Sequence, residues 1–398
     1  MELKTILERY NPWWKEDYNP LGIRRNVYLE KLKSNLQNKQ IIFIMGLRRV
    51  GKTTIIKHFI QYLIEKEKVP PKKILFLTLD DSSLVNKTLT ELIEEFRGLN
   101  SIKFEEKIYL FFDEVSYRED FSRELKVIND NQNVKIFASG SNSIKIIDKK
   151  AFLTGRAFTV KISPLNFEEF LEFSNLKISS IDKQIRDRQF KEYLKIGGMP
   201  EYVLTKNPDV ITTLIEDIIY KDIARIYKIK NINKLREIFL LLCERVGKRV
   251  SYNKLAKIVG IDDETLAEYI SYFQQTFIFS LVKKYSKSLN ERVYSQKKIY
   301  ISDNGIRNIF VGYKDIGSLF ENYVFNEIKN KFGEMAEVFY YFEDNKEIDF
   351  ILRKIPKEEI AIEVKFNEEV ENNLEFFKKS KFEKKLLITN YEDIKKIS

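Results

Sequence analysis

The sequence predicts an α/β protein whose core is a parallel sheet covered by helices on both faces. Five short apolar runs recur in the first part of the chain, helical patterns separate them, and one run leads directly into a glycine-rich loop. Apolar runs that alternate with helices are typical of β-α units, in which both faces of each strand are buried. The predicted strands are Ile41–Met45, Ile74–Leu79, Ile108–Phe112, Val134–Ala138 and Phe158–Ile162.

The glycine-rich loop Gly46–Thr53 has the pattern G-x-x-x-x-G-K-T and opens the helical segment Thr54–Ile64. Strand, loop and helix in this order are the context of a phosphate-binding P-loop. There the backbone N–H groups surround a phosphate, Lys52 lies along the β- and γ-phosphates, and Thr53 ligates Mg²⁺. A chance glycine turn is the alternative, but the four fixed positions and both flanks match. We predict that ATP and Mg²⁺ bind through Gly46, Arg49, Gly51, Lys52, Thr53 and Thr54.

Polar residues follow the third and fourth predicted strands. The third strand ends in Asp113-Glu114, the Walker B pattern, in which Asp113 holds Mg²⁺ through its water shell and Glu114 polarises the attacking water as general base. The fourth ends in Ser139-Gly-Ser-Asn142. Ser139 or Asn142 could hold the attacking water as a γ-phosphate sensor between the Walker strands. A serine-rich turn without a catalytic role is the alternative.

Arg156 follows Gly155 just before the fifth predicted strand. A guanidinium group there could act as an arginine finger, which stabilises charge on the phosphoryl group transferred in a neighbouring subunit. In that case the active form is a homo-oligomer, for example a ring. A solvated surface arginine is the alternative.

Several short motifs resemble, in their order along the chain, the prokaryotic AAA+-superfamily ATPases common in archaea. These motifs are Gly46–Thr53, Asp113-Glu114, Ser139–Ser141, Gly155-Arg156, Pro164–Phe170 and Gly197–Pro200. In that family a restriction-endonuclease-like domain follows the ATPase. The resemblance covers nearly the whole chain and implies an ATPase core, a helical lid and a finger-like role for Arg156.

Together with changes of pattern along the chain, this resemblance suggests a division into parts. The expected fold is α/β, with a P-loop parallel-sheet ATPase core, a helical lid, a winged-helix middle domain and a smaller α/β restriction-endonuclease-like domain. The expected ranges are 1–35 for a helical lead-in, 36–164 for the core, 165–233 for the lid, 234–298 for the winged helix and 299–398 for the last domain.

The winged-helix prediction rests on two helical segments joined by a tight turn. The first ends at Gly260, and Asp262 is a plausible N-cap of the second. Basic residues that could form a β-wing follow, namely Lys283, Lys284, Lys287, Arg292, Lys297 and Lys298. Such a module can bind DNA through its phosphates. However, the second helix begins with three acids, so a winged helix that contacts protein stays open beside DNA binding.

The last domain contains acidic residues with the spacing of PD-(D/E)xK nucleases. Asp349 precedes Glu363-Val-Lys365 by about fourteen residues, and Glu363 and Lys365 face the same side of a predicted strand. Asp349 and Glu363 would bind Mg²⁺, Lys365 would orient or deprotonate the attacking water, and Glu321 on a preceding helix would complete the shell. The alternatives are a salt-bridged structural cluster and a domain that binds DNA without cutting it.

Composition narrows the remaining choices. No apolar run is long enough to span a membrane or to serve as a signal peptide, so we expect a cytoplasmic protein without membrane contact. One cysteine excludes an internal disulfide, and the net charge of +10 favours nucleic acid as a partner. The sequence therefore predicts an Mg²⁺-dependent ATPase coupled to DNA binding or remodelling, with cleavage by the last domain left open. The rivals are a nucleotide-gated switch acting on protein partners and a nuclease whose nucleotide site regulates assembly.

Overall fold

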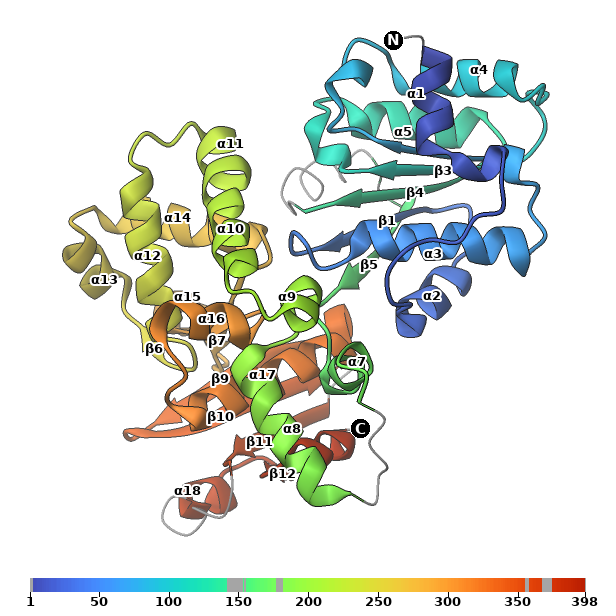
Figure 1. The fold of residues 1–398 in the computed structure, drawn as a ribbon. Helices are drawn as coiled ribbons and strands as arrows, with labels where there is room; N and C mark the ends of the chain where they lie inside the picture. Colours follow the sequence, from blue (N-terminus) through green and yellow to red (C-terminus); the bar gives the residue numbers. More distant parts are fainter. Residues whose placement is uncertain are drawn as a thin grey trace. The chain divides into compact units, whose positions relative to one another are not determined.

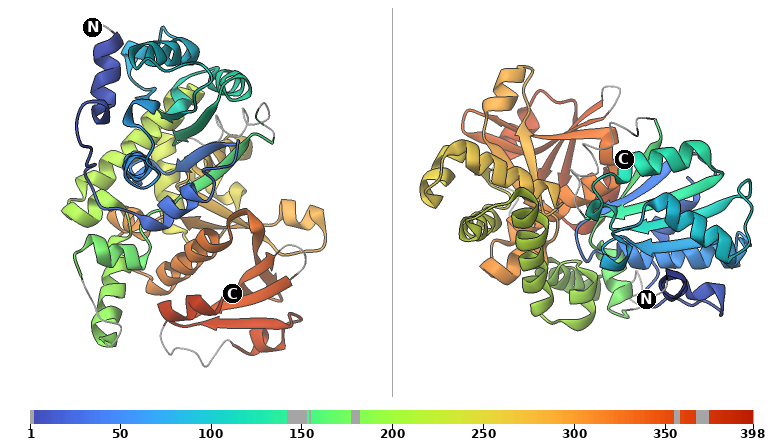
Figure 2. Two further views of the ribbon diagram at one scale, coloured as in Figure 1. Left: turned by 90° about the vertical axis from the view of Figure 1, so that its right-hand side faces the viewer. Right: turned by 90° about the horizontal axis from the view of Figure 1, so that it is seen from above.

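The chain folds into two compact units, Met1–Ile162 and Ser163–Ser398 (Figure 1; Figure 2). The computed structural model describes residues 3–141, 153, 155–176, 182–354, 358–366 and 374–397. The first unit contains a parallel sheet and the second a mixed sheet.

The sheet of the first unit has the strand order β2-β3-β4-β1-β5, with all neighbours parallel. Its strands are β1 (Ile41–Gly46), β2 (Ile74–Thr78), β3 (Ile108–Asp113), β4 (Val134–Gly140) and β5 (Ala157–Ile162). Each strand coincides with a predicted apolar run, so the predicted parallel core is confirmed. Because β4 lies between β1 and β3, the residues at its end lie between the P-loop and the Walker B pair.

Helices cover both faces of this sheet. Phe59 packs against Phe137, and Phe121 packs against Phe43. Phe137 lies level with Ile42 in the parallel register, and side chains alternate between faces, so Phe43 and Phe137 point to opposite sides. The helices are α1 (Leu3–Tyr10), α2 (Asn26–Lys33), α3 (Lys52–Glu65), α4 (Leu89–Leu99) and α5 (Phe121–Asn131), with Phe59 on α3 and Phe121 on α5.

The N-terminal lead-in packs along the edge strand β2. Asn11 accepts a hydrogen bond from Phe76 N at 2.6 Å and donates one to Phe76 O at 3.0 Å, as a neighbouring strand would. The indole N–H groups of Trp13 and Trp14 both donate to Ile74 O. These contacts pair the backbone of an edge strand that would otherwise be open to other chains. The lead-in is thus part of the first unit.

The sheet of the second unit has the strand order β12-β11-β10-β9-β7-β8-β6. Its strands are β6 (Arg249–Val250), β7 (Phe279–Lys284), β8 (Lys297–Ile301), β9 (Ala336–Glu343), β10 (Lys346–Lys354), β11 (Glu358–Val364) and β12 (Lys384–Ile388). A short parallel pairing of β7 with β9 joins its two halves. The domain boundary that we expected after residue 298 falls inside β8, so one sheet continues across it.

The helices expected to form a lid pack within the second unit. Phe190 of α8 contacts Phe320 and Tyr323 edge-on, and Asn308 donates to the carbonyls of Leu194 and Lys195 at the end of α8. Their role as a lid over the nucleotide stays a prediction. The helices of this part are α7 (Phe167–Phe173), α8 (Lys183–Ile196), α9 (Pro200–Thr205), α10 (Asp209–Asp217), the π-helical turn Ile218–Ala224 and α11 (Arg225–Tyr227).

The expected helix–turn–helix segment forms two helices joined by a short turn. Helix α13 ends before Gly260, and Asp262 accepts a hydrogen bond from Thr265 N at 2.8 Å, as expected of an N-cap. The segment expected as a wing contains β7, a short helix and β8. The remaining helices are α12 (Ile232–Glu244), α13 (Tyr252–Val259), α14 (Asp263–Gln275), α15 (Leu289–Tyr294), α16 (Asn304–Val311), α17 (Ile316–Phe332) and α18 (Leu374–Lys379).

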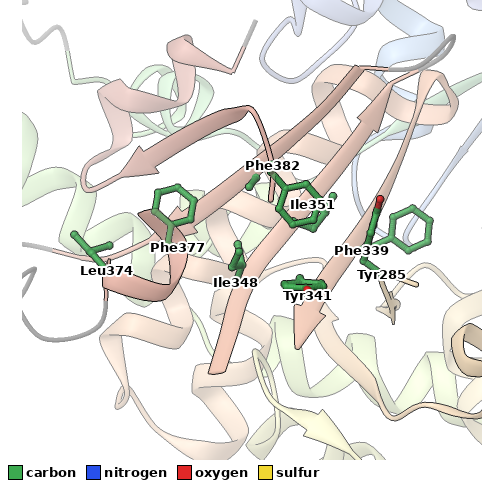
Figure 3. Packing of buried hydrophobic residues seen from close by; sticks show 9 residues of the cluster. Tyr285, Phe339, Tyr341, Ile348, Ile351, Leu374, Phe377 and Phe382 are labelled. Atoms are coloured by element: carbon green, nitrogen blue, oxygen red, sulfur yellow. The ribbon is translucent and has the colours of Figure 1, made fainter. Parts of the chain in front are cut away.

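A β-bulge in β10 decides which of its side chains enter the core. The pairing with β9 is regular up to Ile348 and resumes at Ile351. Both isoleucines lie in the apolar cluster beneath α18, together with Phe377 and Phe382 (Figure 3). Residues three apart in a regular strand would face opposite sides, so the bulge is needed for this packing. It leaves Asp349, between the two, to face the other side of the sheet.

Candidate functional site

The P-loop connects the end of β1 to the start of α3. Gly51 has φ of 96° and Arg49 has φ of 60°, so the loop takes left-handed conformations that turn its backbone N–H groups inward. Space above Gly51 is open, because a Cβ built there meets nothing within 4 Å. At Gly46, by contrast, a Cβ would lie 2.3 Å from Ile162 O. The loop therefore has the open cradle that a phosphate requires, and glycine is needed at both ends.

Lys52 is buried at the start of α3, inside the curve of the loop. Its ammonium group donates to the carbonyls of Gly46 at 3.1 Å and Leu47 at 3.2 Å, and Glu114 Oε1 lies 3.9 Å away. The lysine charge is thus held between the P-loop and the Walker B pair.

Thr53 and Asp113 meet directly. The Thr53 hydroxyl donates to Asp113 Oδ2 at 2.5 Å, and the Ser139 hydroxyl donates to Asp113 Oδ1. A hydroxyl and a carboxylate side by side at a P-loop are the oxygen donors that Mg²⁺ takes in nucleotide sites. The residues present therefore fit Mg²⁺, with Thr53 and Asp113 to hold it. Bound Mg²⁺ would neutralise part of the negative charge of the phosphates.

Glu114 has a left-handed backbone, with φ of 53°. Such a conformation is uncommon for a residue other than glycine and often marks a functional site. Its N–H donates to Ser139 Oγ at 3.2 Å, and its carboxylate accepts a hydrogen bond from Ser141 Oγ at 3.2 Å. Ser139 lies near the end of β4 and Ser141 directly follows it, so β4 positions the expected general base. Asn142, the other expected sensor, lies outside the described residues.

The lead-in supplies a P-loop contact that the sequence did not suggest. Arg25 is buried, and its guanidinium donates to Val50 O at 3.2 Å. Gly22 lies against Thr54, since a Cβ at Gly22 would come within 2.9 Å of Thr54 Cγ2. Only the proximity of these segments in the fold reveals the contact, although the sequence shows an arginine pair before α2.

Arg156 lies at the amino end of the parallel strands, whereas the P-loop lies at their carboxyl end. Its carbonyl accepts a hydrogen bond from Ile41 N, at the start of β1, whereas the P-loop follows the end of β1. The six residues of β1 separate the backbone of Arg156 from the P-loop by roughly 17 Å. The side chain pairs with Asp130 at 2.8 Å and stays partly exposed. Arg156 is therefore remote from the P-loop of its own subunit.

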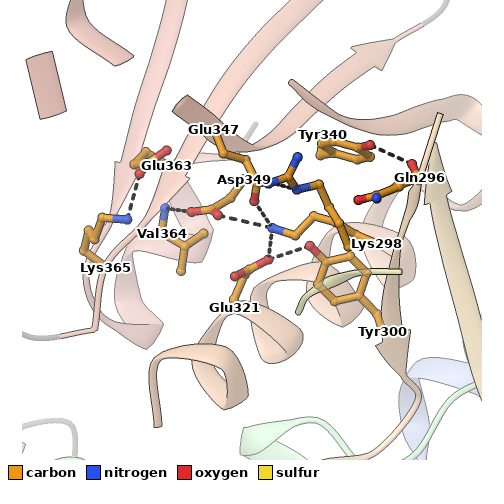
Figure 4. A network of polar contacts seen from close by, with 11 residues as sticks. Gln296, Lys298, Tyr300, Glu321, Tyr340, Glu347, Asp349, Glu363, Val364 and Lys365 are labelled. Carbon is orange, nitrogen blue, oxygen red and sulfur yellow. Dashed lines mark hydrogen bonds and ion pairs between the residues drawn. The ribbon is translucent and has the colours of Figure 1, made fainter. Parts of the chain in front are cut away.

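Two of the three acids expected to bind metal in the last domain, Glu321 and Asp349, contact a buried lysine together with Glu347. Lys298 Nζ lies 2.7 Å from Glu321, 2.6 Å from Glu347 and 3.5 Å from Asp349 (Figure 4). Its side chain is only 1% exposed. Burial would lower the pKa of Lys298, but the surrounding acids, with Glu321 foremost, hold it well above its ordinary value. The expected wing residue Lys298 is thus an interior cation.

Glu363 and Lys365 form the other end of this cluster. As predicted from their spacing they lie together, with 2.7 Å between Lys365 Nζ and Glu363 Oε1. Burial, reinforced by Asp349, raises the pKa of Glu363 to about 8. Glu363 Oε2 is buried and has no hydrogen-bond donor among the described residues, which is the one feature that suits a metal ligand.

The other two expected ligands do not fit a metal ion in this arrangement. Asp349 directs one oxygen to Lys298 and accepts a hydrogen bond from Val364 N with the other, at 2.9 Å. Glu321 Oε1 accepts from both Lys298 and Tyr300. Within the described ranges, no group of three or more His, Cys, Asp or Glu side chains is arranged to hold a metal ion. Two of the three expected ligands, Glu321 and Asp349, are thus engaged by the ammonium group of Lys298.

The wing is also less basic than its sequence suggests. Lys284 pairs with Glu291 at 2.6 Å, and Lys297 donates to the carbonyls of Val293 and Ser295. With Lys298 buried as well, Lys283 and Lys287 are the exposed lysines of this segment.

Comparisons with known proteins show which proteins this chain is similar to. Residues 38–171 match an AAA domain, and residues 187–316 and 316–398 match two domains of unknown function, DUF8612 and DUF4143. An uncharacterized protein of Methanocaldococcus jannaschii is 30% identical over 346 residues, which cover 83% of this chain and 76% of that protein. The chain belongs to the family of that protein. An uncharacterized protein of Haemophilus influenzae is 29% identical over 92% of this chain and 93% of its own length.

Two solved structures show weaker similarity. The chain is 16% identical to Hsp104 in the S. cerevisiae Hsp104–ADP complex, with a TM-score of 0.34, and the match covers 69% of this chain and 42% of that one. For the structure of Drosophila ORC bound to AT-rich DNA and Cdc6, identity is 12% and the TM-score is 0.25, with 79% and 94% covered. The match of this chain to an AAA domain agrees with the sheet and the P-loop described above. None of the described helices has the length and apolar character needed to cross a membrane.

Proposed function

We propose that the chain is an Mg²⁺-dependent ATPase that hydrolyses ATP in its first unit. The convergence of Thr53, Asp113, Lys52 and Glu114 at the carboxyl ends of β1 and β3 is the observation that carries this proposal. The match of residues 38–171 to an AAA domain supports it independently.

Each of these residues has a role that follows from its chemistry. The P-loop N–H groups and Lys52 would bind the phosphates and offset their charge. Thr53 and Asp113 would hold Mg²⁺. Glu114 would accept a proton from the attacking water, with Ser141 orienting its carboxylate through the 3.2 Å hydrogen bond. Ser139 would keep Asp113 and the Glu114 backbone in register.

We further propose that Arg156 acts on the nucleotide of a neighbouring subunit. Its distance from the P-loop of its own chain supports a role in trans, and its partly exposed guanidinium is accessible to a partner. The active form would then be a homo-oligomer.

As the partner on which ATP hydrolysis acts, we propose DNA. The support is the net charge of +10 and the pair of helices α13 and α14, which are joined as in helix–turn–helix modules. Exposed Lys283 and Lys287 lie next to this pair in the sequence and would contact phosphates.

A second candidate is a nucleotide-gated switch that acts on a protein partner. Three apolar side chains of α15 favour it, because Leu289, Val293 and Tyr294 are 65%, 52% and 86% exposed. The acids Asp262, Asp263 and Glu264 at the start of α14 would also oppose a DNA phosphate.

The rate of ATP hydrolysis in Mg²⁺, with and without duplex DNA, tests both proposals. Lys52→Ala is the blank, and the measurement is repeated at two salt concentrations. A Lys52-dependent rate that DNA raises several-fold, less so at high salt, supports coupling to DNA. A Lys52-dependent rate that DNA leaves unchanged rejects DNA as the partner and favours the switch. If Lys52→Ala hydrolyses ATP as fast as the wild type, the ATPase proposal itself fails.

A further inference from the structure

The carboxylate cluster of the second unit contains its own cation. Lys298 has three N–H donors, and three carboxylates lie around them, those of Glu321, Glu347 and Asp349. At 2.6 and 2.7 Å, two of the three contacts have the length of strong charge-assisted hydrogen bonds. The lysine therefore has its donors directed at acids and is removed from solvent.

The fold fixes Lys298 in this position. In the antiparallel pairing of β6 with β8, Arg249 lies directly opposite Lys298, so the two side chains project on the same face of the sheet. Arg249 contacts the second oxygen of Glu347 at 3.1 Å, and its guanidinium lies 3.5 Å from the centre of the Phe342 ring. Asp349 lies two residues after Glu347 in β10, so their side chains project on the same face.

Neighbouring donors engage the same acids, at the Glu321 oxygen that Lys298 also contacts and at the second oxygen of Asp349. Tyr300 donates to Glu321 at 2.5 Å and is itself stacked on Phe325, and Val364 N donates to Asp349 at 2.9 Å. A divalent cation would need these oxygens at 2.0–2.6 Å, in a shell of its own, as the ranges for Mg²⁺ and Ca²⁺ show. It would also have to lie close to an ammonium group of like charge. The arrangement is complementary to a lysine and not to a dication.

We propose that Lys298 is the permanent cation of this cluster, in place of the metal that its acidic residues suggest, and that the cluster performs no metal-dependent cleavage. The ammonium group joins β8, α17 and β10 through Glu321, Glu347 and Asp349. Its role is to stabilise the second unit. This inference is independent of the ATPase proposal, because it concerns other residues in the other unit.

Binding of Mn²⁺ without nucleotide tests the proposal directly. Electron paramagnetic resonance of free Mn²⁺ is compared between the wild-type full-length chain, Asp349→Asn and Glu363→Gln. We expect all three to bind Mn²⁺ equally and to nick supercoiled plasmid equally in Mg²⁺, at the level of buffer. Glu363→Gln leaves the three lysine contacts intact, so the comparison stands if Asp349→Asn does not fold. A Mn²⁺ site or a nicking activity that either variant loses would overturn the proposal.

Melting temperatures test the structural role of the lysine. Lys298→Met leaves three buried acids without their cation, and we expect the melting temperature to fall by about 6–15 °C. Lys298→Arg keeps the charge and should recover part of this loss. Lys284→Met, which removes a lysine from an exposed ion pair, is the matched control and should change it by about 2 °C or less. A Lys298→Met chain that melts like the wild type would reject the role of Lys298 as the cluster's cation.

Discussion

At the scale of single residues, the strained backbone of Glu114 marks the chemistry of the first unit. A non-glycine residue with φ of 53° is retained only where its surroundings impose it. Here Ser139 and Ser141, both at the end of β4, accept from its N–H and donate to its carboxylate. The side chain is thereby directed toward Lys52 and the P-loop.

Glu114→Gln should abolish turnover and spare nucleotide binding. The amide has nearly the shape of the carboxylate but cannot accept the proton of the attacking water. We expect the rate of ATP hydrolysis to fall about 100-fold or more. Affinity for a fluorescent ATP analogue should stay within about threefold, because phosphate binding depends on the P-loop. A Glu114→Gln chain that hydrolyses ATP at the wild-type rate would exclude this glutamate as the base.

Arg25→Ala should weaken the P-loop from outside the motif. The variant leaves Val50 O without the buried guanidinium donor and loses the packing of Arg25 on Tyr28. We expect a loss of about 1–3 kcal/mol in stability and weaker binding of ATP, with the rate at saturation changed less. Arg24→Ala, at the exposed neighbour, is the control for the loss of charge. Equal ATP affinity in the two variants would show that Arg25 does not position the loop.

At the scale of elements, one buried acid connects two parts of the second unit. Asp303 caps α16 by accepting from Ile306 N at 3.1 Å, and it also accepts from Gly198 N, in the motif Gly197–Pro200. That motif, which contributed to the family resemblance, thus has a structural role between α8 and α9. Burial outweighs these hydrogen bonds and raises the pKa of Asp303 to about 6.

The raised pKa makes the stability of this junction depend on pH. The folded chain holds a proton on Asp303 that the unfolded chain, with a pKa near 3.8, has released. The stabilisation of the folded chain by protonated Asp303 is therefore present below about pH 4 and is lost as the pH rises through about 6. Asp303→Asn keeps an acceptor but does not titrate. From pH 4 to pH 7, we expect the wild type to lose on the order of 2–3 kcal/mol relative to this variant in urea unfolding. Parallel pH profiles would contradict the shift.

At the scale of the whole molecule, the position of Arg156 at the amino end of the strands is relevant to whether the chain forms an oligomer. The arginine and the P-loop lie at opposite ends of β1, so one chain cannot bring both to one nucleotide. If Arg156 contributes to hydrolysis, two chains must share a site.

Mixing experiments test such sharing. Arg156→Ala should lower the rate of hydrolysis about 10³-fold or more, the usual contribution of an arginine finger. Glu114→Gln retains Arg156 and is inactive for another reason, so a mixture of the two variants should regain activity through mixed oligomers. Lys39→Ala, an exposed residue before β1, is the control for charge loss at this edge. A mixture no more active than its parts would exclude action in trans.

The sequence by itself determined the sheet of the first unit and the positions of its P-loop and Walker B residues. Each predicted strand formed, and Lys52, Thr53, Asp113 and Glu114 came together as their motifs required. The reason is that the P-loop and Walker B residues directly follow strands of one parallel sheet, so the sheet brings local patterns to a common edge.

Tertiary structure alone decided the acidic cluster of the second unit. From the sequence, Lys298 was one of several basic residues predicted to form an exposed wing. The pairing of β8 with β6 and the packing of α17 place it instead among the acids of this cluster. The bulge in β10 likewise brought Ile351 to the same apolar cluster as Ile348. Contacts between residues far apart in the chain depend on strand register and on burial. Neither can be predicted from the spacing of residues along the sequence. Glu321 and Asp349, two of the carboxylates that suggested a metal site, are paired with a lysine fifty-one residues before Asp349.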